Sequence, residues 1–234
     1  MLNLLIEQES REILFLEIAD LMQALAAKRP IFHSEADFQH AFAWEIHQRL
    51  PAANVRLERP VMTDTGMVHL DLWASYEGQH IAVELKYKKH ELITRWQGEH
   101  FVLANDGAQP LGRYDFIKDI TRLERVVEHR QDVTGYAILL TNEPAYWTGG
   151  SVVLSSKRTP FDTAFRVAEG STLPKQKVMA WGSGVSTGTI KGREPPLKLD
   201  SAYALHWTDY SQLPDVASYG QFRYLALTVT RPVT

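Results

Sequence analysis

The chain has 234 residues, of which 44% are hydrophobic and 23% charged, and its formal net charge is −3. This composition is typical of a globular protein with a sizeable core, and the balanced charge excludes the uniformly basic field of a nucleic-acid coat protein. The lack of cysteine excludes disulfides, thiolate nucleophiles and cysteine-ligated zinc, so any metal must be bound through oxygen or imidazole, and it fits a reducing compartment.

The N-terminal part of the chain shows apolar positions at helical spacing. Ile18, Leu21 and Leu25 recur every three or four residues between charged side chains, and neither Gly nor Pro occurs before Pro30. This pattern predicts an amphipathic helix over residues 2–28 that closes over the core. Charged residues interrupt the first apolar run at once, so it has the length of neither a signal peptide nor a membrane span. We therefore expect a cytoplasmic protein that is not associated with a membrane.

A second helix and three strands are expected next. Ser34 can cap a helix, with Asp37 three residues later as in a capping box, and Pro51 ends it. Glu45 lies within the apolar stripe of this helix. Alternating apolar positions then predict strands, separated by turns at 63–66 and 77–79, over residues 54–62, 67–76 and 80–88.

The second half of the chain predicts one strong helix and one central strand. A loop over 105–112 precedes an amphipathic helix over 113–130, and residues 134–142 form a nearly continuous apolar run that predicts a strand covered on both faces. Turn-rich sequence follows, with short strands expected at 176–181, 202–207 and 222–230. This order predicts an α/β/α sandwich with a central mixed sheet in a single domain. Its parts are an N-terminal helix (1–30), a core (31–145) and a loop-rich extension that completes the sheet (146–234).

The predicted hairpin carries acids and a base among apolar residues. If Glu77 and Gly78 form a two-residue turn, the numbers of paired residues sum to 155, and Asp71 stands opposite Glu84. Alternation then places both acids and Lys86 on one face. Facing carboxylates repel each other unless a cation lies between them, and Mg²⁺ prefers such hard oxygen ligands. The opposite face is predicted to be apolar, with Leu70, Leu72, Val83, Leu85 and Tyr87.

These residues resemble the active site of the PD-(D/E)XK nuclease superfamily, which has the restriction-endonuclease-like fold. Glu45 in "AFAWEIH" matches the helical acid of that family, and Asp71 in "VHLDLW" matches the strand aspartate. Glu84 and Lys86 in "IAVELKYK" match the Glu-x-Lys of the neighbouring strand. The proline that often precedes the aspartate is absent. The resemblance covers residues 34–142, and much of its specificity comes from the order helix, strand, strand, helix, strand.

The resemblance implies a hydrolase that cuts phosphodiester bonds in nucleic acid with Mg²⁺ or Mn²⁺, DNA being favoured over RNA as substrate. In that family the strand acids bind the metal, the helical acid binds a second metal or a bridging water, and the lysine acts on the attacking water. Enzymes of this kind often work as homodimers. Carried over, Lys86 is the catalytic lysine, and the metal ligands are Asp71, Glu84, Glu45 and the backbone oxygen of Leu85.

Further residues are candidates for contact with the phosphate backbone, namely Lys88 and Lys89 after the motif and Tyr114 and Lys118 in the next helix. As alternatives, Tyr114 and Lys118 belong to a solvated helix face, and Lys88 and Lys89 are charges that protect the edge of a strand. For the whole chain, one rival hypothesis is a catalytically inactive module on the same fold that binds nucleic acid or a protein. The other is a structural or assembly protein whose acids are solvated.

Overall fold

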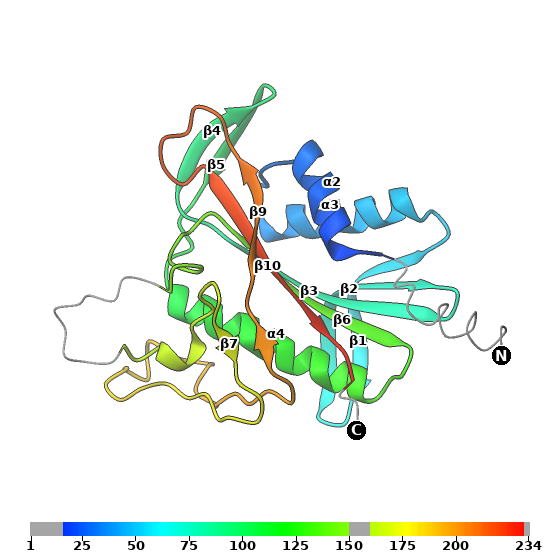
Figure 1. The fold of residues 1–234 in the computed structure, drawn as a ribbon, viewed down its shortest axis with the longest axis vertical. Helices are drawn as coiled ribbons and strands as arrows, with labels where there is room; N and C mark the ends of the chain where they lie inside the picture. The colour runs from blue at the N-terminus through cyan, green and yellow to red at the C-terminus, as the bar shows by residue number, and fades with distance from the viewer. Residues whose placement is uncertain (1–15, 150–159, 232–234) are drawn as a thin grey trace.

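The computed structural model describes residues 16–149 and 160–231, and its centre is a mixed sheet of six strands (Figure 1). Strands β3 and β6 are parallel, and all other neighbours in the sheet are antiparallel. The order across the sheet is β1 (Asn54–Thr63), β2 (Gly66–Tyr76), β3 (Gln79–Lys88), β6 (Val133–Thr141), β10 (Gln221–Val229) and β9 (Trp207–Gln212).

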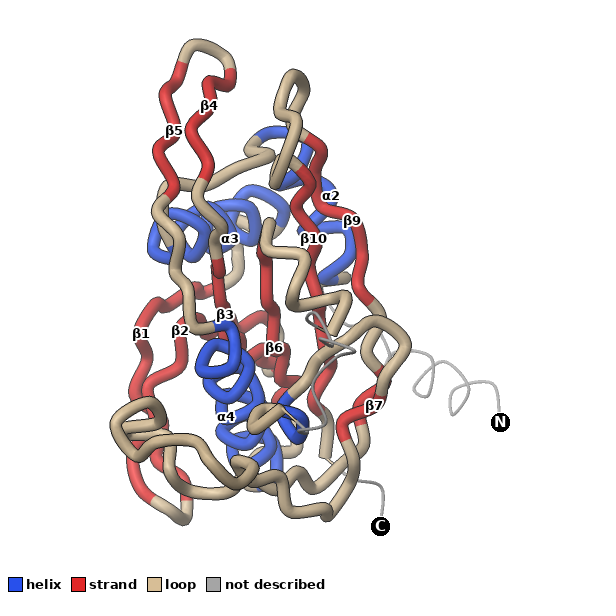
Figure 2. The backbone as a smooth tube through the Cα atoms, turned by 90° about the vertical axis from the view of Figure 1, so that its left-hand side faces the viewer, coloured by secondary structure: helices blue, strands red, loops and turns tan. Residues whose placement is uncertain are grey.

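Three α-helices in the described residues cover the two faces of this sheet. Helices α2 (Ile18–Lys28) and α3 (Glu35–Arg49) pack on one face, and α4 (Gln109–Glu128) packs on the other (Figure 2). Each interface has its own cluster of buried apolar side chains. The fold is therefore a mixed α/β structure with helices on both sides of a central sheet.

The predicted elements of the core are confirmed with small changes at their ends. Ser34 caps α3 by accepting a hydrogen bond from the Asp37 N–H at 3.1 Å. Helix α4 begins at Gln109, four residues earlier than predicted, because Pro110 occupies its first turn, where a missing N–H costs nothing. The predicted helix over 2–28 is observed from Ile18 onward, and residues 1–15 of it lie outside the described residues. No described helix is long and apolar enough to cross a membrane.

The less regular segments differ more from the predictions. The hairpin of β4 (Leu92–Trp96) and β5 (Glu99–Leu103) was not predicted and extends from one end of the molecule (Figure 2). The predicted strand over 176–181 is wrong, because that segment makes only an isolated bridge at Met179. Between 160 and 205, loops on the α4 face contain one small pair of strands, β7 (Thr172–Leu173) and β8 (Tyr203–Ala204). The predicted strand over 222–230 is confirmed as β10.

The register of the β2–β3 hairpin is the predicted one. Tyr76 pairs with Gln79, and the ladder keeps the sum of 155 as far as Leu72 and Val83. Glu77 and Gly78 form the turn with φ values of 48° and 79°, the left-handed conformation that a two-residue hairpin turn requires. Beyond Leu72 the two strands separate, and β3 continues its pairing with β6 alone.

A paired distortion in β1 and β2 accompanies this separation. The ladder between these strands omits Glu58 and Asp71, while the register on either side is the same. Glu58 has a φ of 49°, and the Gln39 side-chain amide donates to both the Asp71 carbonyl at 2.6 Å and the Glu58 carboxylate at 3.1 Å. The distortion reverses the side-chain alternation. Leu70 consequently belongs to the core on the α4 face, and its predicted place beside Leu72 on the α3 face is wrong.

We predict that Gly78→Ala lowers the free energy of unfolding by about 1 kcal/mol, because a Cβ disfavours the left-handed conformation. Gly78→Asn should cost less, since Asn tolerates this conformation. Chemical denaturation of the two variants measures the difference. Equal losses would show that the turn does not depend on the backbone conformation at this position.

Candidate active site

The acids and the lysine predicted on the hairpin lie together on the face of the sheet that α4 covers. The Asp71 carboxylate accepts a hydrogen bond from the backbone N–H of Leu85 at 2.6 Å and lies 3.9 Å from Lys86 Nζ. Lys86 Nζ also lies 2.9 Å from Asp119 Oδ2 of α4. The side chain of Glu84 is only 1% exposed. We call Asp71, Glu84, Lys86, Asp119 and Arg122 the carboxylate cluster.

Two members of this cluster, Asp119 and Arg122, come from α4 and were not predicted. Arg122 lies 3.0 Å from Glu84 Oε1, donates to Asp119 Oδ1 at 2.9 Å and donates to the backbone carbonyl of His69. It thus ties α4 to both strands of the hairpin. A signal for Asp119 existed in the sequence, because it lies on the apolar stripe of α4, three residues after Phe116.

Glu84 is the member whose charge is least compensated. Although Oε1 is close to Arg122, neither carboxylate oxygen of Glu84 accepts a hydrogen bond from a described residue. Burial, and then the negative charges of Asp119 and Asp71, raise the pKa of the Glu84 carboxyl from 4.5 to about 10. Without a further cation, Glu84 therefore holds a proton at neutral pH.

Burial and neighbouring charges also shift the pKa values of the other two groups from the hairpin, Asp71 and Lys86. Burial raises the pKa of Asp71, and the positive charge of Lys86 and the Leu85 N–H partly oppose this. Burial lowers the pKa of Lys86, but the surrounding carboxylates of Asp119, Asp71 and Glu35 outweigh it and raise the pKa above its usual value. Lys86 is therefore a permanent positive charge within the cluster.

The helical acid near this site is Glu35, and Glu45 is placed elsewhere. Glu35, in the first turn of α3, accepts a hydrogen bond from the Tyr87 N–H at 2.8 Å and adds negative charge near Asp71. The buried Glu45 is paired with Lys28 at 2.6 Å and Arg49 at 3.2 Å. Burial raises its pKa, but these two cations outweigh that effect and lower it. Glu45 joins α2 to α3 and has no described contact with the carboxylate cluster.

The remaining predicted residues are distributed differently from the expectation. Tyr114 is buried and donates to the Pro195 carbonyl at 2.8 Å, so it does not reach the surface where a phosphate backbone would lie. Lys89 is bound by both carboxylate oxygens of Asp106 at 3.0 Å. Lys118 is exposed, and Lys88 is half-buried. The Leu85 carbonyl, predicted as a metal ligand, accepts from Lys86 Nζ at 3.2 Å.

The donor atoms of the cluster have the chemistry that Mg²⁺ or Mn²⁺ prefers. Asp71, Glu84 and Asp119 provide hard carboxylate oxygens, and the unbonded, buried oxygens of Glu84 would gain most from a cation. In the described residues, however, no three acidic or histidine side chains already converge in the geometry of a metal site. Lys86 and Arg122 supply the positive charge instead. The residues fit a divalent cation by type, provided that Arg122 moves away from Glu84.

The chain matches no protein-family model, no curated protein and no solved structure. The carboxylate cluster and the order of the elements around it are therefore the basis for a functional hypothesis.

We predict that Glu84→Gln stabilises the metal-free protein above pH 5 and that the gain grows with pH. The folded state holds the Glu84 proton up to about pH 10, whereas the unfolded state releases it near 4.5, so the wild type loses up to about 1.4 kcal/mol per pH unit in this window. Below pH 4.5 both states are protonated and the variants should agree. Denaturation curves between pH 4 and 9 measure this.

The matched control for this experiment is Glu91→Gln, which neutralises an exposed carboxylate. This variant should not show the growing gain in stability that is expected of Glu84→Gln. A Glu84→Gln curve parallel to that of wild type would contradict a protonated Glu84.

Proposed function

We propose that this protein is a divalent-metal-dependent nuclease with a restriction-endonuclease-like core, acting on DNA rather than RNA. The observation that carries the proposal is a buried glutamate, Glu84, whose two oxygens are unbonded and which faces Asp71 and Lys86. The order α3, β1, β2, β3, α4, β6, with these residues on β2 and β3, supports the resemblance to the PD-(D/E)XK superfamily.

In this proposal Asp71 and Glu84 would hold the metal, with Asp119 and the Leu85 carbonyl beside them. The bound ion would act as a Lewis acid and lower the pKa of a water. Asp71 keeps its place because it accepts the Leu85 N–H, and Glu84 must give up its proton to bind a cation. Arg122, 3.0 Å from Glu84 Oε1, would have to move aside for that exchange.

Lys86 is suited to stabilise negative charge on a phosphate group. Because the carboxylates around it raise its pKa, it keeps its proton at neutral pH and is poorly suited to accept one from water. Its Nζ, held 2.9 Å from Asp119, can donate hydrogen bonds to phosphate oxygens as charge builds up on them. We accordingly propose that Lys86 orients the water and stabilises the transition state.

A non-cutting module that binds nucleic acid or a protein is the second candidate. The 3.0 Å contact between Arg122 and the almost fully buried Glu84 favours it, because a cation must displace this arginine. The two candidates differ in whether a divalent ion binds at the cluster and in whether phosphodiester bonds are broken.

We predict that Glu84→Gln and Lys86→Met each lower metal-dependent cleavage of plasmid or linear DNA roughly 100-fold or more. Glu45→Gln is the matched control: it should destabilise the protein by about 1 kcal/mol through its lost ion pairs while cleavage persists. Gel assays with Mg²⁺ or Mn²⁺ measure the rates. If Glu45→Gln is fully folded but does not cleave, Glu45 belongs to the active site after all. If wild type cleaves neither DNA nor RNA, the protein is not a nuclease.

We also predict that Mg²⁺ or Mn²⁺ raises the melting temperature of wild type but not of Glu84→Gln. At a concentration 100 times the Kd the stabilisation is about 2.7 kcal/mol. Because Glu84 is protonated near pH 7, binding should release a proton, which calorimetry in buffers of different ionisation enthalpy detects. Neither a heat nor a melting shift with wild type would favour the non-cutting module.

A further inference from the structure

A groove of about 540 Å³ runs along β1 at the edge of the sheet. Its lining includes Arg56 and Arg59 of β1, Trp73 of β2 and His80 of β3. Trp73 belongs to the core on the α4 face, the same face on which Lys86 meets Asp119. The Trp73 side of the groove and the cluster therefore lie on the same face of the sheet.

Three guanidinium groups gather around Trp73. Arg59 lies 4.2 Å and Arg130 lies 5.4 Å from the centre of a Trp73 ring, and Arg56 comes from the same stretch of β1. In the described part of the chain none of the three forms an ion pair with Asp or Glu, in contrast to arginines such as Arg113 and Arg193. Burial, and then the charges of Arg130 and Arg56, lower the pKa of Arg59.

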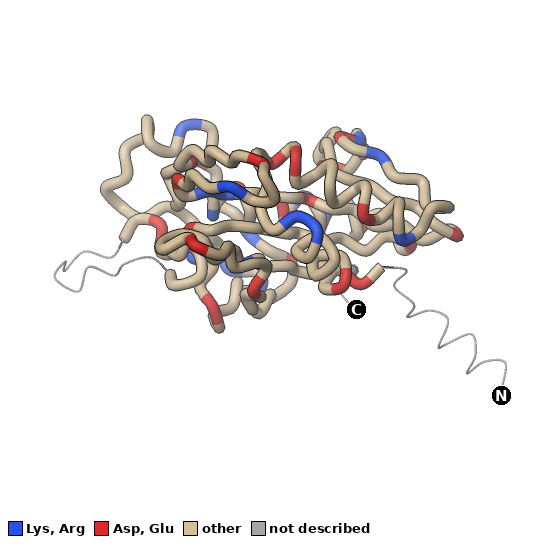
Figure 3. Tube along the Cα trace, turned by 90° about the horizontal axis from the view of Figure 1, so that it is seen from above, with Lys and Arg blue, Asp and Glu red and all other residues tan. Residues whose placement is uncertain are grey.

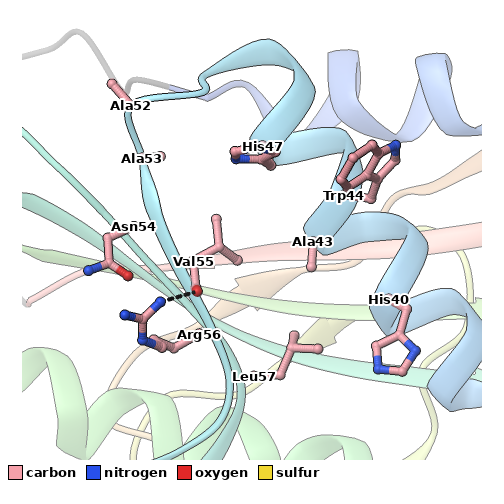
Figure 4. A pocket seen from close by; sticks show the side chains of 10 residues that line it. All are labelled: His40, Ala43, Trp44, His47, Ala52, Ala53, Asn54, Val55, Arg56 and Leu57. Carbon is pink, nitrogen blue, oxygen red and sulfur yellow. Dashed lines mark hydrogen bonds between the residues drawn. The ribbon is translucent and has the colours of Figure 1, made fainter.

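The distortion of β1 explains how two of these arginines reach the same face. Residues 56 and 59 would point to opposite faces of a regular strand. The left-handed conformation of Glu58 reverses the alternation, so that Arg59 lies over Trp73 while Val55 and Leu57 still pack toward α3. Figure 4 shows Val55 and Leu57 pointing toward α3 and Arg56 pointing away from it. The same distortion that places Asp71 thus assembles the guanidinium groups.

The acids near this groove already have partners. Glu58, which lines the groove, accepts a hydrogen bond from the Gln39 side-chain amide at 3.1 Å. Asp132 lies 3.0 Å from Nε2 of His80, whose Nδ1 is hydrogen-bonded to Ser75 Oγ at 2.7 Å. Three guanidinium groups without carboxylate partners repel one another and favour an anion. Planar guanidinium groups match phosphate oxygens better than any other side chain.

We propose that Arg56, Arg59 and Arg130 bind the phosphate backbone of a nucleic-acid strand and guide it toward the carboxylate cluster. Trp73, around which the arginines gather, pairs with Ala82, and Ala82 lies two residues, about 7 Å along β3, before Glu84 of the cluster. The identity of the strand as substrate rests on the proposed nuclease function, whereas binding of the strand does not.

The test is binding of fluorescent single-stranded and duplex oligonucleotides, measured by anisotropy in EDTA as a function of salt. Arg59→Gln/Arg130→Gln should weaken binding on the order of tenfold and reduce the slope of log K against log salt by about 0.7 to 0.9 per lost contact. Arg59→Lys/Arg130→Lys should retain the slope, because the charge remains. Arg95→Gln, at an exposed arginine on the β4–β5 hairpin, removes one positive charge outside the groove, as Arg56→Gln removes one within it, and should bind like wild type.

Melting curves show whether each variant is folded, and the exposed Arg56→Gln provides an independent measurement if the double variant is not. An unchanged salt slope in Arg56→Gln and in the double variant, or no binding by wild type, would overturn the inference. Binding of inorganic phosphate by a protein that binds no oligonucleotide would overturn it as well. Wild type that binds oligonucleotides through these arginines but cleaves none would support the groove and contradict the nuclease. Cleavage by wild type, with a KM that is unchanged in the double variant, would support the nuclease and contradict the role of the groove.

Discussion

The hydrogen bond from the Leu85 N–H to the Asp71 carboxylate is the interaction on which the site depends. Beyond Leu72 and Val83 the two strands of the hairpin separate. The N–H of Leu85, which points toward β2, therefore has no backbone acceptor on that strand. A buried N–H without an acceptor costs about 1–3 kcal/mol. The carboxylate of Asp71 replaces the missing ladder bond, and in doing so it is held next to Lys86.

The same local geometry separates opposite charges along one face of the sheet. The carboxylates of the cluster stand against Lys86 and Arg122, and the guanidinium groups around Trp73 lie toward the β1 edge. Over the whole molecule acidic and basic positions are interspersed, as the view in Figure 3 illustrates, in keeping with the net charge of −3. Attraction of a polyanion by these guanidinium groups would therefore be local, and the carboxylates of the cluster would repel phosphates unless a cation binds.

The sequence predicted the parts that depend on local chemistry. The Glu77–Gly78 turn determines the register of the hairpin, and alternation then brings Asp71, Glu84 and Lys86 together. Glu45 was misplaced because an acid on an apolar stripe indicates burial but not its partner, which here is Lys28 on another helix. Asp119 satisfies the same criterion and does lie at the site.

Other features had a weaker local signal or none. The β4–β5 hairpin has a turn at Gln97 and Gly98 with φ values of 48° and 84°, the same chemistry as Glu77 and Gly78, so its signal was present but its strands are short. The distortion at Glu58 has no such signal, since a glutamate in the left-handed conformation is stabilised there by Gln39 from α3. Only the tertiary arrangement shows it.

The part of the chain after residue 160 explains why Asp119 and Arg122 stand where they do. Its loops hold α4 through Glu124, whose buried carboxylate accepts hydrogen bonds from the N–H groups of Asp200 and Ser201 and from the Tyr203 hydroxyl. Burial raises the pKa of Glu124, and these donors oppose it.

Glu124 and Glu84 are thus both buried glutamates on the α4 side of the sheet, but they differ in their partners. Glu124 has three donors and holds loops to a helix, which is a complete structural role. Glu84 has a 3.0 Å contact with Arg122 and no hydrogen bond from a described residue, so its burial is a net cost to the folded protein. A fold that satisfies one buried acid completely and leaves the other without donors favours a ligand at the second, and this contrast is the physical reason to propose a binding site at Glu84.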